Sequence, residues 1–283
     1  MSFTPRACAS GNYGWLLLVG IGLTTPAGAY TINVYAAAPA VVSSPASGGT
    51  AFTENFNNSG SAWPVGLRTQ PVTRPIGTFQ LSTSSALRIQ NADPYGGASN
   101  SRYAAFGAQS NTAGAITLNL SNPTTYFGLW WSAIDANNGI SLYNNNDLLV
   151  RFSGADLISI FSATPTLTAQ NGSVYNTSAY LGKPGTNPRQ NAGEYYVYTM
   201  FRLSGLTFNR VVFDNSGTTA TGFEMDNLQI RTGNFTIPTS TVLLRTYDIQ
   251  PVPEPSFWIP AGAGLIVAAW WRRRARSRQA TRQ

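Results

Sequence analysis

The stretch YFGLWWSA at positions 126–133 decides the fold class, because it is an almost unbroken run of apolar and aromatic residues. A short run of this composition is typical of a β-strand that is buried on both faces. Weaker strand signals surround it. Ile116, Leu118 and Leu120 alternate with small or polar residues, and strands expected at 140–143 and 148–152 flank the turn sequence Asn-Asn-Asn-Asp at 144–147.

Four further strands are expected at 195–203, 208–213, 223–230 and 242–249, and one helical turn at 155–161 with Asp156 as its N-cap. Many short strands separated by turn residues indicate an all-β protein, an antiparallel two-sheet sandwich of the jelly-roll-like kind. We expect one domain at 51–250. Residues 30–50, which are mostly Ala, Pro, Ser and Gly from position 36 on, are predicted to be a flexible segment that leads into it.

The N-terminal residues 1–29 have the three parts of a secretory signal peptide. Arg6 gives a basic start, the run at 15–23 is a short apolar core, and Ala27-Gly28-Ala29 supplies the small residues that signal peptidase accepts. The run is too short to cross about 30 Å of hydrocarbon. We therefore expect export through the general secretion machinery and cleavage between Ala29 and Tyr30; a retained anchor is the alternative.

Residues 251–283 carry a second targeting signal. Its parts are, in order, the motif Val252-Pro253-Glu254-Pro255, an uncharged run at 256–271, and a basic tail at 272–283 that opens with Arg272, Arg273 and Arg274. A helix over the run is about 24 Å long, which spans the membrane if the bilayer thins locally and the flanking arginines extend outward. Because arginines stay on the cytoplasmic side, this transmembrane helix is predicted to leave the body outside.

This arrangement resembles the PEP-CTERM sorting signal, in which a Pro-Glu-Pro motif, a hydrophobic helix and an arginine cluster end the chain. The resemblance implies that an exosortase, a transpeptidase-like membrane enzyme of Gram-negative bacteria, cuts near Pro253-Glu254-Pro255. The protein is then expected to be held only transiently in the inner membrane, and to finish at the cell surface or in the extracellular space. A permanent C-terminal anchor is the alternative, because spanning a bilayer requires no cleavage.

The excess of positive charge lies in the two predicted targeting segments and not in the body of the chain. The formal net charge is +7, but six arginines lie in 272–283 and Arg6 lies in the signal, which leaves 11 basic and 10 acidic residues in 30–251. A body this close to neutral lacks the basic footprint of a nucleic-acid-binding protein. The chain has no histidine, and its only cysteine, Cys8, lies in the signal. The mature protein therefore lacks disulfides, the commonest zinc ligand and the usual proton shuttle at neutral pH.

The body also resembles a family of exosortase-dependent surface proteins over about residues 75–230. The matching parts are the aromatic strand and the Asp and Asn that follow it at 126–138, the hairpin ending in Leu-Val-x-Phe at 149–152, Phe-x-Arg-Val-Val-Phe at 208–213, and Gly-Phe-Glu-x-Asp-Asn at 222–227. The family carries no assigned activity. The resemblance therefore implies location and fold, and it names no ligand.

Two groups of side chains are candidates for binding. Trp130 and Trp131 offer either an aromatic platform for sugar rings or ordinary core packing, and neighbours on a strand point to opposite faces. Glu54, Asp226 and Asn227 are candidate calcium ligands if the first and last strands lie side by side. Calcium takes six to eight oxygens, so we expect no cofactor, with calcium as the alternative. The Asp and Asn residues at 135–138 are explained equally well by turn formation.

We therefore expect an exported, non-catalytic surface or matrix protein. Its expected partners are the secretion machinery, signal peptidase, an exosortase, the inner membrane and, outside the cell, exopolysaccharide. One alternative is a secreted hydrolase acting on that polymer, which needs two carboxylates about 5 Å or 6.5–9.5 Å apart; no such pair is visible from spacing. The other alternative is a purely structural coat protein that associates with itself.

Overall fold

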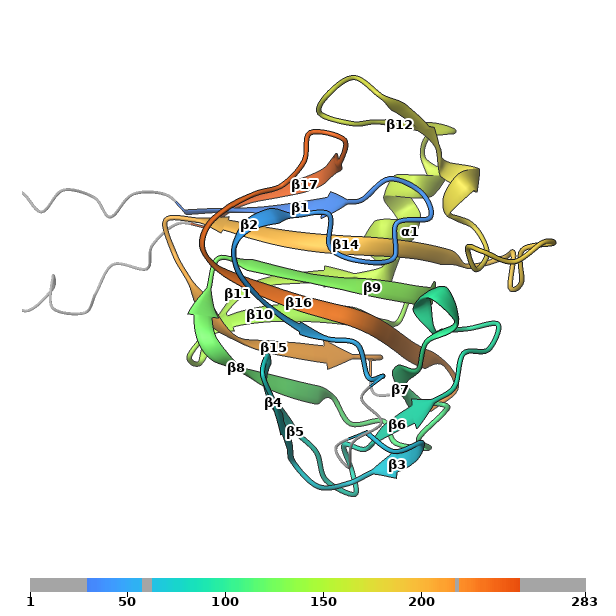
Figure 1. Ribbon diagram of the computed structural model, residues 1–283, viewed down its shortest axis with the longest axis vertical. Coiled ribbons are helices and arrows are strands. Elements are labelled where there is room, and N and C mark those ends of the chain that lie inside the picture. The colour runs from blue at the N-terminus through green and yellow to red at the C-terminus, as the bar shows by residue number, and fades with distance from the viewer. Residues whose placement is uncertain (1–29, 58–62, 217–218, 250–283) are drawn as a thin grey trace, which may run out of the picture.

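The computed structural model describes residues 30–57, 63–216 and 219–249, and shows them as layered β-structure (Figure 1). The predicted signal peptide at 1–29 and sorting tail at 251–283 lie outside the described residues. Within them no helix is both long and apolar enough to cross a bilayer. The predicted transmembrane helix at 256–271 is not among the segments described.

The larger sheet of the described chain has nine antiparallel strands in the order β17-β1-β14-β9-β16-β7-β6-β3, with β2 paired to β16. Its strands are β1 (Tyr30–Ala36), β2 (Ser47–Glu54), β3 (Gly66–Arg68), β6 (Leu87–Gln90), β7 (Tyr103–Gly107), β9 (Tyr126–Ile134), β14 (Tyr195–Ser204), β16 (Gly222–Thr236) and β17 (Val242–Ile249).

The smaller sheet of the described chain has six antiparallel strands in the order β11-β10-β15-β8-β5-β4. They are β4 (Val72–Arg74), β5 (Gly77–Gln80), β8 (Ile116–Thr124), β10 (Gly139–Asn144), β11 (Asp147–Ser153) and β15 (Phe208–Asp214). A separate hairpin joins β12 (Thr166–Thr168) to β13 (Val174–Asn176). The helices of the described chain are α1 (Gly154–Ser162) and two 3-10 turns, η1 (Ala98–Asn100) and η2 (Thr177–Tyr180).

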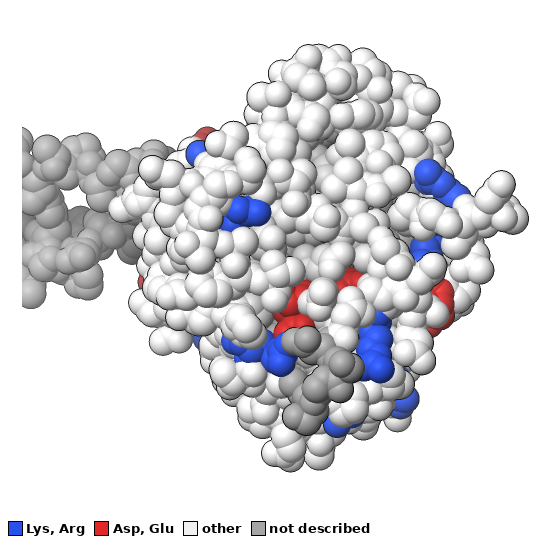
Figure 2. Space-filling model, in the orientation of Figure 1, with Lys and Arg blue, Asp and Glu red and all other residues white. Residues whose placement is uncertain are grey.

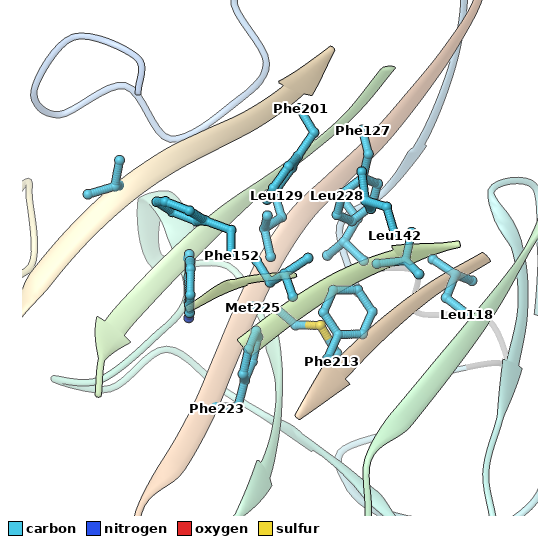
Figure 3. Packing of buried hydrophobic residues seen from close by; sticks show 14 of the residues in the cluster. Leu118, Phe127, Leu129, Leu142, Phe152, Phe201, Phe213, Phe223, Met225 and Leu228 are labelled. Carbon is cyan, nitrogen blue, oxygen red and sulfur yellow. The ribbon is translucent and has the colours of Figure 1, made fainter. Parts of the chain in front are cut away.

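The main core lies between the two large sheets, as Figure 3 shows. Phe127, Phe201 and Met225 enter it from the nine-stranded sheet, and Leu142 and Phe213 enter it from the six-stranded sheet; all five are fully buried. Burying one such side chain stabilises the fold by about 1.5–3 kcal/mol. The protein is therefore all-β, with antiparallel sheets packed face to face in a sandwich-like arrangement, as the sequence predicts.

Strand β9 is buried along its whole length, which confirms the prediction for the aromatic run. Phe127, Leu129 and Trp131 point into the main core, while Tyr126 and Trp130 belong to a second cluster on the opposite face. Residues 37–46 help to cover that second face. Because Trp130 is 1% exposed and Trp131 is 0% exposed, core packing is the correct interpretation and the sugar-platform interpretation of these residues is wrong.

The other predicted strands are confirmed as β8, β10, β11, β14, β15, β16 and β17. The helix is confirmed as α1, but its N-cap is Ser153, not Asp156. Ser153 ends β11 with extended backbone, and its hydroxyl accepts from the backbone N of Asp156, whose carboxylate accepts from the backbone N of Ser153. This reciprocal pair is a capping box, and it places Asp156 at the third helical position.

The flexible segment predicted at 30–50 is wrong at both of its ends, and residues 47–50 belong to β2. Residues 30–36 form β1, which lies between β14 and β17, and Ile32 and Val34 in it are fully buried. Apolar side chains alternate with Thr31 and Asn33 there, which suits a strand within a sheet. The sheet therefore includes residues from Tyr30 on, whereas the sequence predicts a domain that starts at residue 51.

Candidate functional site

The two ends of the described chain lie side by side at one pole of the sheet, which we call the exit pole. Tyr30 of β1 is the Cα partner of Ile249 in β17, and Thr31 is the partner of Ser204 at the end of β14. Both ends lie at the left of Figure 1. The segments before Tyr30 and after Ile249 therefore start from neighbouring points.

The outer face of the six-stranded sheet carries an open pocket of about 360 Å³. Three segments that are distant in sequence contribute to it: the middle of β8, the turn between β10 and β11, and the start of β15. Its lining is dominated by side-chain amides, with one guanidinium group: Asn119, Leu120, Asn145, Asn146, Asn209 and Arg210.

A pair of amides fixes the hairpin turn against β15. The backbone N of Asn145 donates to Oδ1 of Asn209 at 2.8 Å, and Nδ2 of Asn209 donates to Oδ1 of Asn145 at 2.7 Å. Asn145 has φ of 54°, a left-handed conformation that Asn tolerates in turns. Asn119 and Asn146 are exposed and make no side-chain hydrogen bond within the described residues. Their amides are available to a ligand.

Arg210 provides the positive charge of the pocket. Its guanidinium carbon lies 4.3 Å from the centre of the Tyr143 ring, in a cation–π contact across the β10–β15 pair. None of the three ion pairs within the described residues includes Arg210, and its buried Nε has no hydrogen-bond partner there. An unsatisfied guanidinium is a strong donor for a carboxylate or another anionic oxygen.

The pocket is part of a polar row that crosses the sheet. Successive cross-strand partners are Thr73 with Thr78, Thr78 with Asn119, Asn119 with Arg210, and Arg210 with Tyr143. The two threonine hydroxyls lie 3.0 Å apart. Four steps between neighbouring strands at about 4.8 Å make the row roughly 19 Å long.

The pocket belongs to the exit pole. Strand β14 ends at Ser204 beside Thr31, and only residues 205–207 separate it from β15, where Asn209 and Arg210 follow. Gly205 lies against the Tyr30 ring, since a Cβ there would meet Cδ1 of Tyr30 at 2.9 Å. The pocket and the two chain ends therefore share one end of the sandwich.

The three candidate calcium ligands have other partners. β2 pairs with β16 so that Glu54 is the partner of Leu228, which brings the predicted strands together. However, Glu54 forms a 2.6 Å ion pair with Arg74 and accepts from the backbone N of Phe56 at 2.8 Å. These contacts use both oxygens of a carboxylate that is 1% exposed.

The side chains of Asp226 and Asn227 also have hydrogen-bond partners within the fold. Oδ2 of Asp226 accepts from the backbone N of Ala98 and from Oγ of Ser101, and Oδ1 accepts from the backbone N of Asn227. The Asn227 amide donates to the Val42 carbonyl, and its φ of 48° marks a bulge in β16. No group of three or more acidic, His or Cys side chains suited to a metal ion occurs among the described residues. The side chains of Glu54, Asp226 and Asn227 are therefore engaged in contacts that stabilise the fold.

A second group of carboxylates surrounds Glu224, which lies two residues before Asp226 in β16. Burial holds the pKa of Glu224 well above its usual range, and the nearby Asp135 and Glu194 raise it further. Gln109 donates to Glu224 Oε1, and both side chains need the space left by Gly222, where a Cβ would meet them within 2.5 Å. Glu224 is 2% exposed, so a polysaccharide has no access to it, although its chemistry would suit a general acid.

The Asp and Asn residues at 135–138 form a turn, as one of the two interpretations predicts. The backbone N of Asn138 donates to the Asp135 carbonyl, Oδ1 of Asn138 accepts from the backbone N of Asp135, and its amide donates to the Gly222 carbonyl. Asn138 is fully buried. It therefore ties the loop after β9 to the start of β16.

The chain matches no known protein-family model and no curated protein. Similarity to proteins of known activity therefore adds no site to those described above, and a proposal for the function depends on the chemistry of these residues and on the targeting signals predicted from the sequence.

Sequence reasoning missed the pocket, although it found the strands that form it. The turn at 144–147 and the stretch at 208–213 are visible in the sequence, but only the register brings Asn119, Asn145 and Arg210 together. The sequence feature that could have indicated the pocket is Arg210. It is an outward-facing charge between the buried Phe208 and Val211, in a body with few charges.

Proposed function

We propose that this chain is an exported, non-catalytic surface protein that an exosortase processes. Signal peptidase removes residues 1–29, and the tail at 251–283 holds the body on the outer side of the inner membrane until the exosortase cuts near Pro253-Glu254-Pro255. The body, a sandwich of jelly-roll-like topology, then resides at the cell surface or outside the cell, where it contacts exopolysaccharide.

One observation carries the proposal: the residues next to the two predicted targeting signals are cross-strand neighbours. Tyr30 of β1 directly follows the expected signal cleavage, and its partner Ile249 of β17 lies three residues before Val252. Both cuts would therefore leave every described strand intact. Because Tyr30 and Ile249 are partners, the two membrane signals also leave the body at one point, so both can lie in the same bilayer.

The tether between body and membrane is short. Seven residue steps separate Ile249 from Ser256, the first residue of the apolar run, and each step spans at most about 3.5 Å, which gives roughly 25 Å. An anchored body would therefore stand close to the bilayer with its exit pole facing it. This geometry brings the motif within reach of an enzyme that lies in the membrane.

The chemistry of the surface supports a binding role. The amide groups of the pocket donate and accept hydrogen bonds and its guanidinium donates them, but neither kind of group gains or loses a proton near neutral pH. Figure 2 shows that charged side chains are sparse on the face of the nine-stranded sheet and that the two signs lie close together there. A nearly neutral, amide-bearing surface suits contact with hydroxyl-rich polymers better than with nucleic acid.

Mass spectrometry of the mature protein tests the proposal. In cells with the exosortase, the N-terminus should be Tyr30 and the C-terminus should lie close to Pro253-Glu254-Pro255. In cells that lack the enzyme, the mature protein should retain residues 251–283. A Glu254→Ala variant should stay unprocessed, and a Pro251→Ala variant outside the motif should be cut normally. An intact tail in both strains would refute the sorting part of the proposal.

A further inference from the structure

We propose that the pocket on the six-stranded sheet binds an acidic sugar unit within a polysaccharide chain, with Arg210 pairing with the sugar carboxylate. The inference rests on the proposed function only in that export brings the pocket into contact with extracellular polymers. The binding chemistry itself depends on residues of the described fold.

The amides of the pocket suit sugar hydroxyls. A hydroxyl both donates and accepts, and each Asn side chain offers an acceptor oxygen and two donor hydrogens. Asn145 and Asn209 hold each other in place, so their remaining hydrogen-bonding positions are oriented before a ligand arrives. Asn119 and Asn146 add amides that have no side-chain partner within the described residues. Such preorganisation lowers the entropy cost of binding.

The charge of the pocket selects an acidic sugar. Arg74, Arg151 and Arg245 each have a carboxylate partner, whereas Arg210 has none within the described residues. A guanidinium group forms paired hydrogen bonds with a planar carboxylate, and the Tyr143 ring holds the guanidinium plane in position at 4.3 Å. A uronic acid presents such a carboxylate beside ring hydroxyls, which matches the amides around Arg210.

The length of the polar row favours a polymer. Thr73, Thr78, Asn119, Arg210 and Tyr143 follow one another across five strands, over roughly 19 Å. This is longer than one sugar ring, so neighbouring units of the same chain would contact the threonine hydroxyls on one side of the pocket. A single sugar acid would use only the pocket itself.

An anionic lipid surface is the competing ligand, because the pocket lies at the exit pole. Recognition of anionic membranes depends on clusters of basic residues that each add about 1 kcal/mol. Arg210 is the one basic residue that lines the pocket, and Asp147 follows the neighbouring turn. One cation surrounded by amides fits a saccharide better than a lipid surface.

The test is binding of the full chain, purified in mild detergent, to sodium alginate, a polymer of uronic acids, with dextran as the neutral polymer. Because the assay needs no processed protein, its result is independent of exosortase cleavage. We expect alginate binding that weakens as salt increases and little binding of dextran. Arg210→Gln should weaken alginate binding at least tenfold, and Asn146→Ala, at the exposed turn, should weaken it severalfold.

Arg151→Gln is the matched control, since Arg151 lies on the same sheet but is paired with Asp214, and it should bind as the wild type does. Thermal unfolding shows whether Arg210→Gln is folded; if it is not, Asn146→Ala decides. Absence of alginate binding by the wild type would overturn the proposal. Equal effects of Arg210→Gln and Arg151→Gln would also overturn it, as would an Arg210→Gln variant that weakens binding to anionic lipid vesicles and leaves alginate binding unchanged.

Discussion

Replacement of Asp226 by Asn should remove a large part of the pH dependence of folding. Asp226 is fully buried, and burial, with a smaller contribution from the charge of Glu54, raises the pKa of its carboxyl to about 7. Three donors, from Ala98, Ser101 and Asn227, act in the opposite direction without offsetting the burial. The folded state therefore holds a proton on Asp226 far more tightly than the unfolded chain does.

The magnitude follows from the two pKa values. The carboxyl titrates at 3.8 in the unfolded chain and at about 7 in the folded protein, and each unit of difference is worth about 1.4 kcal/mol. The stabilising contribution is complete below pH 3.8 and is lost as the pH rises through 7. Titration of Asp226 should therefore lower the wild-type free energy of unfolding by about 4 kcal/mol between pH 4 and pH 8.

Urea unfolding followed by tryptophan fluorescence at several pH values measures this effect. An Asn at position 226 cannot ionise, and its amide faces the backbone N–H of Asn227, so Asp226→Asn should be less stable than the wild type at pH 4. Relative to the wild type, it should gain about 4 kcal/mol by pH 8. Asp248→Asn, at an exposed position, is the control and should track the wild type. A constant difference between Asp226→Asn and the wild type at every pH would refute the reasoning.

Four further substitutions test contacts within the fold by chemical denaturation. Arg74→Ala leaves the buried carboxylate of Glu54 unpaired and should cost about 3–5 kcal/mol, whereas Arg151→Ala breaks an exposed pair and should cost at most about 1 kcal/mol; equal costs would contradict the burial argument. Gly128→Ala places a Cβ within 2.9 Å of two tyrosine side chains, so we expect a loss of about 1–3 kcal/mol, and an unchanged stability would show that the rings move aside. Ser153→Ala removes the helix cap and should lower the free energy of unfolding by about 1 kcal/mol. An unchanged stability would show that water replaces the hydroxyl.

The strands were predictable because their signals are local. The aromatic composition of β9 predicts by itself that the strand is buried on both faces. The turn sequence at 144–147 indicates the β10–β11 hairpin. The cap of α1 was misassigned because Ser153 and Asp156 are both good capping residues, and only the backbone conformation decides between them. β1 was missed because the small residues that follow it resemble a linker.

The pocket was not predictable because it depends on register. Asn119 and Arg210 become partners only after β8 and β15 pair with a bulge between Phe208 and Arg210. The placement of Asp226 depends likewise on a bulge in β16 and on the loop near Ala98. Long-range contacts of this kind leave no periodic trace in a single sequence, so the chemistry they create appears only in the structure.

The central claim is that the body lies outside the cytosol, held by the tail until it is cut. A fusion that inserts, directly before Val252, a phosphatase that is active only after export tests this claim most directly. We predict high phosphatase activity in whole cells, and loss of that activity when residues 1–29 are deleted. An inactive phosphatase, together with activity of a cytosolic reporter at the same position, would contradict the claim.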